Sequence, residues 1–345
     1  MIAPVSRSSP AALPADRLGV VLLSAGGPDA PEAVPAFVQR RLCEVRRPWL
    51  PRVACRLFAR FAAPRRIRAL RASLAHAGGH VPDARLVRDL AELVEQTLAA
   101  SHPEASWTVV AATTAGTPTL ADAAARLRAA RVERLVAVPL VSVWTEALSA
   151  PLVTAWQAEA NASGLGPLPL DVVRRFADHP EYACAIRERI GEALQRFPRA
   201  TRDDVHVVFA LHPGSTVAGA GPEASPLFEV VRRVAPLLRH AHRTAFARGW
   251  DGAEAAPAVD DTLADLIREG HRHLLIVPIG FVHETMDTVY ELDVAARGAA
   301  ERLGALQFEV AACLNVHEAF VGTVATAVCD VLDVAEAARC TARAA

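Results

Sequence analysis

The sequence predicts an α/β protein made of two successive halves, each with a parallel β-sheet that helices cover on both faces. Three observations lead to this prediction. Short apolar runs of strand length alternate with segments of helical periodicity. The same order begins again near the middle of the chain, and its 345 residues exceed the usual size of a single core.

The first half opens with the apolar run Leu18–Ser24, which ends in the turn Ala25-Gly-Gly-Pro28. Further strands are expected at residues 107–112, 135–141 and 168–173. Helices are expected at 31–43, 83–100 and 120–130. In the second half, strands are expected at 205–212, 243–248, 274–279 and 306–314, and helices at 226–240, 260–270, 284–303 and 317–333.

The domain organisation follows from this order. We expect a disordered tail over residues 1–17, a first domain over 18–170 and a second domain over 171–345. An insertion at 40–79 interrupts the first domain, and between Arg40 and Ala72 it holds eleven Arg against one acid, Glu44. This is typical of a basic amphipathic helix that contacts a membrane surface or an anion. An Arg-rich solvated helix is the alternative, and no recognition motif for nucleic acid accompanies the charge.

Composition excludes several classes of protein. A hydrophobic content of 52% excludes a disordered chain, and no apolar run approaches the ~20 residues of a membrane span. Residues 1–17 lack the apolar stretch of a signal peptide, so a cytoplasmic protein is expected. The six cysteines form no CxxC pair and are expected to be reduced thiols. The sequence holds no lysine, which excludes a P-loop lysine or a Schiff-base lysine.

Candidate site residues follow two of the predicted strands. His283, Asp287 and Glu291 lie four residues apart after the strand that ends at Ile279, so an α-helix there would place them on one face. An imidazole and two carboxylates in a row could form a path along which a hard cation or protons move. The alternative is a solvated helix face, which has the same pattern. His212 ends another strand and should emerge at the same sheet edge, to accept a proton, bind a metal or cap a turn.

Five segments resemble the ferrochelatase family, whose enzymes insert ferrous iron into a porphyrin. They are the opening strand and Gly-Gly-Pro loop at 19–29, the lead into the second half at 175–182, the strand with its histidine at 209–212, the helix start at 280–293 and the closing motif at 313–320. The resemblance implies two Rossmann-like, chelatase-type domains that enclose a porphyrin cleft, with the basic insertion as its lip. It also implies a lyase of haem (porphyrin) biosynthesis.

The resemblance implies roles for particular residues. His212 would be the proton acceptor or metal contact, and Asp287 stands where the family has its catalytic glutamate. The metal contacts would be His212, Asp287, His283 and Glu291. Thr285 stands where the family has a histidine, and His283 offers an imidazole two residues earlier.

The resemblance also implies the partners. These are a porphyrin and ferrous iron, with peripheral contact at the inner face of the membrane through the Arg-rich segment as an option. No organic cofactor is implied, and Cys329 and Cys340 lack the clustered spacing of an iron–sulfur site. A porphyrin-binding paralogue without catalysis and a chelatase for another divalent metal are the alternatives.

Overall fold

The computed structural model describes residues 17–28, 30–38, 82–216, 220–248, 255–285 and 287–344, with short pieces between 64 and 75. The predicted tail, apart from Arg17, and most of the insertion predicted at 40–79 lie outside these residues. The expected contact of that insertion with a membrane or an anion therefore stays a prediction.

Two four-stranded parallel sheets form the framework, which confirms the predicted fold class. The first sheet has the order β2-β1-β3-β4, with β1 at Arg17–Ser24, β2 at Ser106–Thr113, β3 at Arg134–Pro139 and β4 at Leu170–Val172. The second has the matching order β6-β5-β7-β8, with β5 at His206–Leu211, β6 at His242–Phe246, β7 at His273–Ile279 and β8 at Gln307–Val310. The domain boundary predicted after residue 170 falls inside β4.

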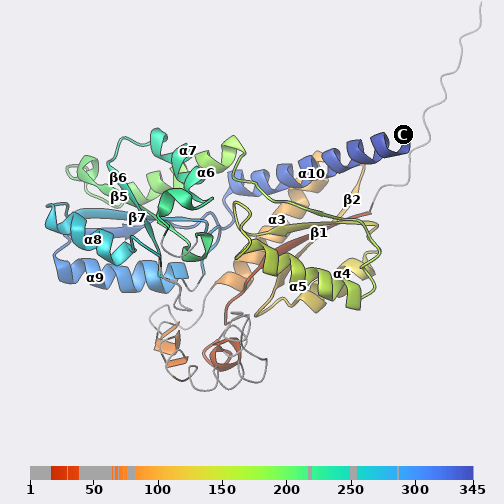
Figure 1. The fold of residues 1–345 in the computed structure, drawn as a ribbon, viewed down its shortest axis with the longest axis horizontal. Helices are drawn as coiled ribbons and strands as arrows, with labels where there is room; N and C mark the ends of the chain where they lie inside the picture. The colour runs from red at the N-terminus through yellow and green to blue at the C-terminus, as the bar shows by residue number, and fades with distance from the viewer. Residues whose placement is uncertain are drawn as a thin grey trace, which may run out of the picture.

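Helices cover both faces of each sheet (Figure 1). They are α3 at Asp83–Ser101, α4 at Leu120–Ala129, α5 at Ser149–Ala162, α6 at Pro180–Leu194, α7 at Phe228–Val234, α8 at Val259–Arg268, α9 at Ala296–Leu303 and α10 at Glu318–Ala344. Sequence periodicity predicted α3, α4 and α8 almost to the residue, but α5 and α6 were not among the expected helices. In α3, the residues that face the sheet recur every three or four positions, as in Val87, Leu90, Val94 and Leu98.

The two halves share one apolar core on the side of α3, α6, α7 and α10. Val20 and Leu22 of β1 and Val207 and Phe209 of β5 belong to this single cluster. The opposite faces have separate cores, under α4 and α5 in the first half and under α8 and α9 in the second. Helix α10 begins in the second half and extends along the first (Figure 1). No helix among the described residues is long and apolar enough to cross a bilayer.

Glycines allow the chain to turn sharply where β1 and β7 end. Gly26 has φ +78°, and a Cβ there would lie 2.2 Å from the carbonyl oxygen of Ala115. Gly280 has φ +91°, and a Cβ there would lie 2.3 Å from Cδ1 of Leu227. A side chain at either position would meet both backbone strain and a clash, so both turns depend on glycine.

Candidate functional site

The helix that follows β7 differs from the predicted one. Residues 280–285 form a loop, and a π-helix then runs over Asp287–Ala295 and continues into α9. The prediction that His283 shares a helical face with Asp287 and Glu291 is therefore wrong, because His283 lies in the loop before the helix. π-helical turns are rare and are often found at functional sites.

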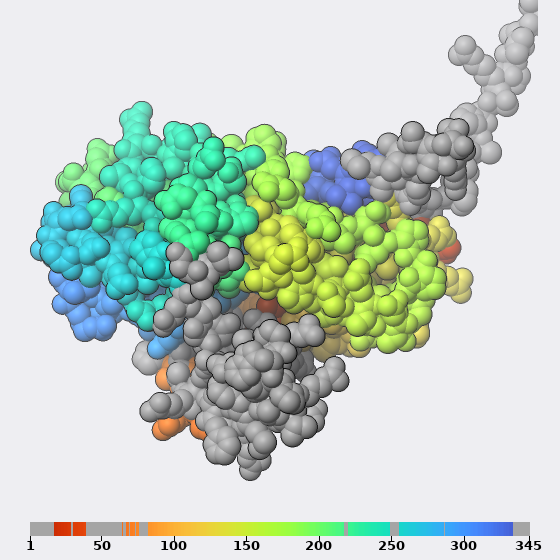
Figure 2. All heavy atoms as spheres, in the orientation of Figure 1, coloured from red at the N-terminus to blue at the C-terminus, as the bar shows by residue number. Residues whose placement is uncertain are grey.

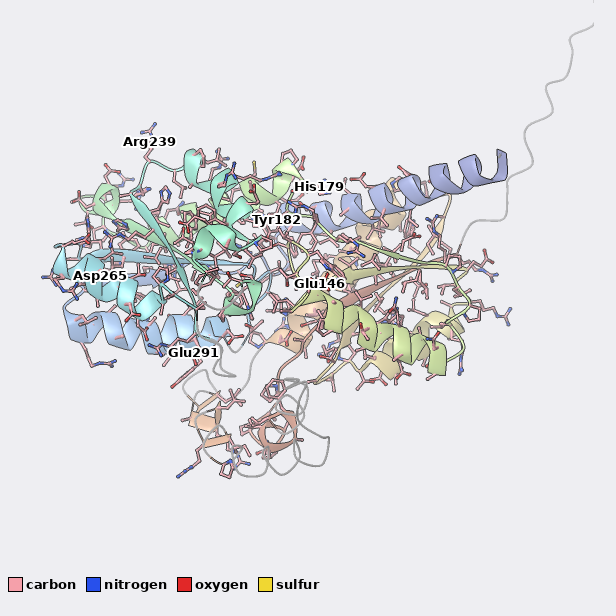
Figure 3. The ribbon with its side chains drawn as sticks, viewed as in Figure 1. Glu146, His179, Tyr182, Arg239, Asp265 and Glu291 are labelled. Atoms are coloured by element: carbon pink, nitrogen blue, oxygen red, sulfur yellow. The ribbon has the colours of Figure 1, made fainter. Side chains whose placement is uncertain are left out.

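Asp287 and Glu291 remain neighbours on the π-helix and affect each other electrostatically. The pKa of Glu291 is raised to about 7, mainly by burial and then by the charges of Asp287 and Asp260, while Arg248 acts to lower it. Asp260 belongs to α8 and pairs with Arg248 at 2.8 Å. Figure 3 shows Glu291 on the side of the second half that lies away from α10. A carboxyl with this pKa exchanges a proton for a cation readily near neutral pH.

His212 directly follows β5, the neighbour of β7, so it lies at the same sheet edge as the π-helix. Its Nδ1 accepts a hydrogen bond from the Gly214 N–H at 3.0 Å, and its ring centroid lies 5.2 Å from that of Phe281. A neutral ring in this arrangement carries its proton on Nε2. The turn-capping role considered for His212 is thus present. Accepting another proton would require His212 to release Gly214.

His283 reaches across to the first half. Its Nε2 lies 2.8 Å from Oδ1 of Asp83, the first residue of α3, and 3.3 Å from Oγ of Ser24, the last residue of β1. The His283 and Asp83 side chains are only 6% and 4% exposed. This nitrogen therefore lies against groups of the first half.

Glu284 and Asn315 fix the loop between β7 and the π-helix. Glu284 accepts hydrogen bonds from the Thr288 hydroxyl at 2.7 Å and from the Cys313 N–H at 2.8 Å. The Glu284 N–H in turn donates to Oδ1 of Asn315 at 2.9 Å. Burial and the nearby Glu284 raise the pKa of the Cys313 thiol, so this cysteine stays protonated. The start of the π-helix is therefore held from its own half of the molecule.

The first half contributes the opposite side of the site. The Trp144 ring lies 4.3 Å from the guanidinium carbon of Arg174, and its Nε1 donates to Glu146 at 2.8 Å. A Cβ on Gly214 would lie 3.0 Å from Cδ2 of Leu148, so the loop after β3 contacts the loop that follows His212. The carboxyl edges of the two sheets thus meet, and Figure 2 shows the halves abutting along a seam.

His212 and the π-helix with Asp287 and Glu291 thus follow neighbouring strands that end at one edge of the second sheet, whereas the ring of His283 contacts the first half. Within the described part of the chain, no three His, Cys, Asp or Glu side chains form a ready-made metal site. Sequence reasoning missed Asp83, whose position after Pro82 signals only the start of a helix. It also missed Glu284, because its partner Cys313 is distant in the sequence.

Comparisons with known proteins find relatives that match most of this chain. A family model described as Ferrochelatase matches residues 17–332. Ferrochelatase from Nostoc punctiforme is 30% identical over 331 residues, which cover 92% of this chain and 82% of the relative. Ferrochelatase from Geotalea uraniireducens is 26% identical over 322 residues, with coverages of 91% and 97%. Among solved structures, SirB from Bacillus subtilis with Fe3+ has a TM-score of 0.54 at 9% identity and coverages of 93% and 98%, a likeness of fold alone.

Proposed function

We propose that this chain, a member of the ferrochelatase family, uses the side chains at the tips of β5 and β7 for its reaction. That reaction is the insertion of ferrous iron into a porphyrin in haem biosynthesis. The supporting observation is that the π-helix holds two interacting carboxylates, Asp287 and Glu291, at the sheet edge where His212 emerges. The chain acts as a lyase without an organic cofactor, and iron is its substrate.

Insertion replaces two pyrrole protons of the porphyrin by one ferrous ion, so the site must remove protons and deliver a cation. His212 accepts the two pyrrole protons one after the other and passes each to solvent, and its hydrogen bond from Gly214 opens whenever the ring takes up a proton. Asp287 and Glu291 supply the oxygen ligands that draw the ion toward the macrocycle. Because Glu291 has a pKa of about 7, it releases its own proton as the cation arrives.

The experiment is anaerobic mixing of the purified protein with a porphyrin and ferrous iron, followed by metalloporphyrin absorption. His212→Ala should abolish turnover and leave porphyrin binding intact, and Asp287→Ala should lower the rate of insertion. The matched control is His242→Ala, since His242 lies at the opposite, amino edge of the same sheet. Insertion by the wild type no faster than the uncatalysed reaction, with several porphyrins tried, would remove the proposal. An unchanged rate in His212→Ala would remove His212 from it.

A porphyrin-binding paralogue without catalysis is the second candidate. The hydrogen bond between Gly214 and Nδ1 of His212 favours it, because the lone pair that a base needs is already engaged. The shorter Asp287 in place of the family's glutamate favours it too. Tight haem binding without insertion would select this candidate, whereas insertion of cobalt or nickel in preference to iron would select a chelatase for another metal. The cytoplasmic location and the membrane contact of the Arg-rich segment stay predictions.

A further inference from the structure

The contact between His283 and Asp83 joins the two halves at the edge of the site. Its two side chains are almost completely buried, and its two residues lie 200 positions apart in the sequence. Asp83 Oδ1 has no aligned hydrogen-bond partner within the described residues, so its 2.8 Å approach to His283 Nε2 is a close polar contact rather than a linear hydrogen bond. Ser24 Oγ, 3.3 Å from His283 Nε2, is the third member of the contact.

On the side of the first half, the carboxylate has a fixed position. Asp83 is the first residue of α3, where the positive end of the helix dipole stabilises an anion. Its Oδ2 would lie 3.5 Å from a Cβ on Gly27, so the carboxylate borders the turn that follows β1. The contact therefore marks the tip of the first sheet.

On the side of the second half, His283 is fixed at its backbone. The preceding Val282 carbonyl accepts a hydrogen bond from the Asn315 N–H at 2.8 Å, and the following Glu284 N–H donates to the Asn315 side chain. His283 is thus held by its own half at the main chain, four residues before Asp287, and by the other half at its ring.

Burial makes the two groups depend on each other. A buried carboxylate or imidazole is costly without its partner, and such pairs serve to specify an arrangement more than to add stability. We propose that His283 and Asp83 are a positioning pair, which fixes the loop leading to Asp287 against the tip of the first sheet. This inference rests on the proposed function, since it assigns the pair the task of setting the distance across which the porphyrin is held.

The first test is kinetic and uses a double-mutant cycle of Asp83→Leu and His283→Leu. Each single variant should lower kcat/KM for the porphyrin by about 10- to 100-fold, because a displacement near 1 Å can cost that much. The kcat/KM of the double variant should be no lower than that of the less active single variant. His283→Gln, which keeps an N–H donor, should recover most of the rate.

The control is Asp330→Asn, which removes the carboxylate of another His–Asp contact between separate helices. Asp330 of α10 lies 3.7 Å from His179, which precedes α6, and Figure 3 shows His179 beside α10 and away from Glu291. This variant should keep the wild-type kcat/KM. Wild-type activity in both Leu variants, or losses that simply add in the double variant, would overturn the inference.

A second test requires neither porphyrin nor activity. Hydrogen exchange of the backbone amides at 280–285 should accelerate in Asp83→Leu and in the milder Asp83→Asn, although the substitution lies in the other half. Asp330→Asn should leave these amides unchanged. If the wild type failed to insert iron, the proposed function would fall, while this result would still decide the pair. Unchanged exchange at 280–285 in Asp83→Leu would refute the pair whatever the enzyme's activity.

Discussion

Replacing Glu291 by Gln should make the metal-free protein more stable at pH 8. The pKa of Glu291 is about 7 in the folded protein against 4.5 for an ordinary glutamate, and burial is the main cause. The folded state therefore binds the proton more tightly than the unfolded state. Stability consequently falls as pH rises from about 4.5 to 7, and the whole cost persists above that range. The difference between the two pKa values corresponds to at most about 3 kcal/mol in the free energy of unfolding, and partial exposure of Glu291 reduces this to about 1–2 kcal/mol.

The assay is thermal unfolding of the wild type and Glu291→Gln with a chelator present, at pH 4.5 and pH 8. At about 2–4 °C per kcal/mol, the variant should melt several degrees higher at pH 8 and at nearly the same temperature at pH 4.5. Glu301→Gln is the matched control, because Glu301 is exposed on the neighbouring α9. A variant that melts no higher than the wild type at pH 8, or gains as much at pH 4.5, would show that burial does not raise this pKa.

Three further predictions concern stability. The pKa of His206 is lowered to about 4, mainly by burial. The free energy of unfolding of the wild type should therefore fall by about 1–3 kcal/mol as the pH falls from 6.5 to 4. In the same pH series of urea unfolding, His206→Leu should lose less. Glu284→Ala should cost about 1–3 kcal/mol in urea unfolding, since it leaves the Cys313 N–H without its acceptor; an equal effect of Glu284→Gln would contradict this. Phe320→Ala should cost about 3–5 kcal/mol in the same assay, because the fully buried ring packs on Phe176; a loss below 1 kcal/mol would refute it.

Local sequence patterns were sufficient for the framework of the fold. Strands such as β1 and β7 are apolar runs that end in glycine turns, and parallel pairing then brings the ends of β5 and β7 to one edge. For this reason, the sequence predicts that His212, Asp287 and Glu291 follow strands that end at the same sheet edge, and their grouping into one site stays a prediction. Helix α6 was missed because it begins at Pro180, inside the segment 175–182 that was interpreted only as the lead into the second half.

The details of the site depended on information that local patterns lack. The spacing of four residues from His283 to Glu291 presupposes an α-helix, whereas the wider turns of a π-helix begin only at Asp287. Nothing near Asp83 in the sequence indicates that its partner is His283. The hydrogen bond from Gly214 to His212 follows from the turn at Pro213, which sequence reasoning noted only as a possible cap.

The apolar layer formed by α3, α6 and α10 has a consequence for how the polypeptide can be divided. Because side chains from both sheets belong to that one cluster, cutting the chain near residue 200 would expose a broad apolar surface on each fragment. Neither fragment should be an autonomous folding unit. Co-expressed pieces should instead reassociate, and heating the intact chain should give one cooperative calorimetric peak rather than two.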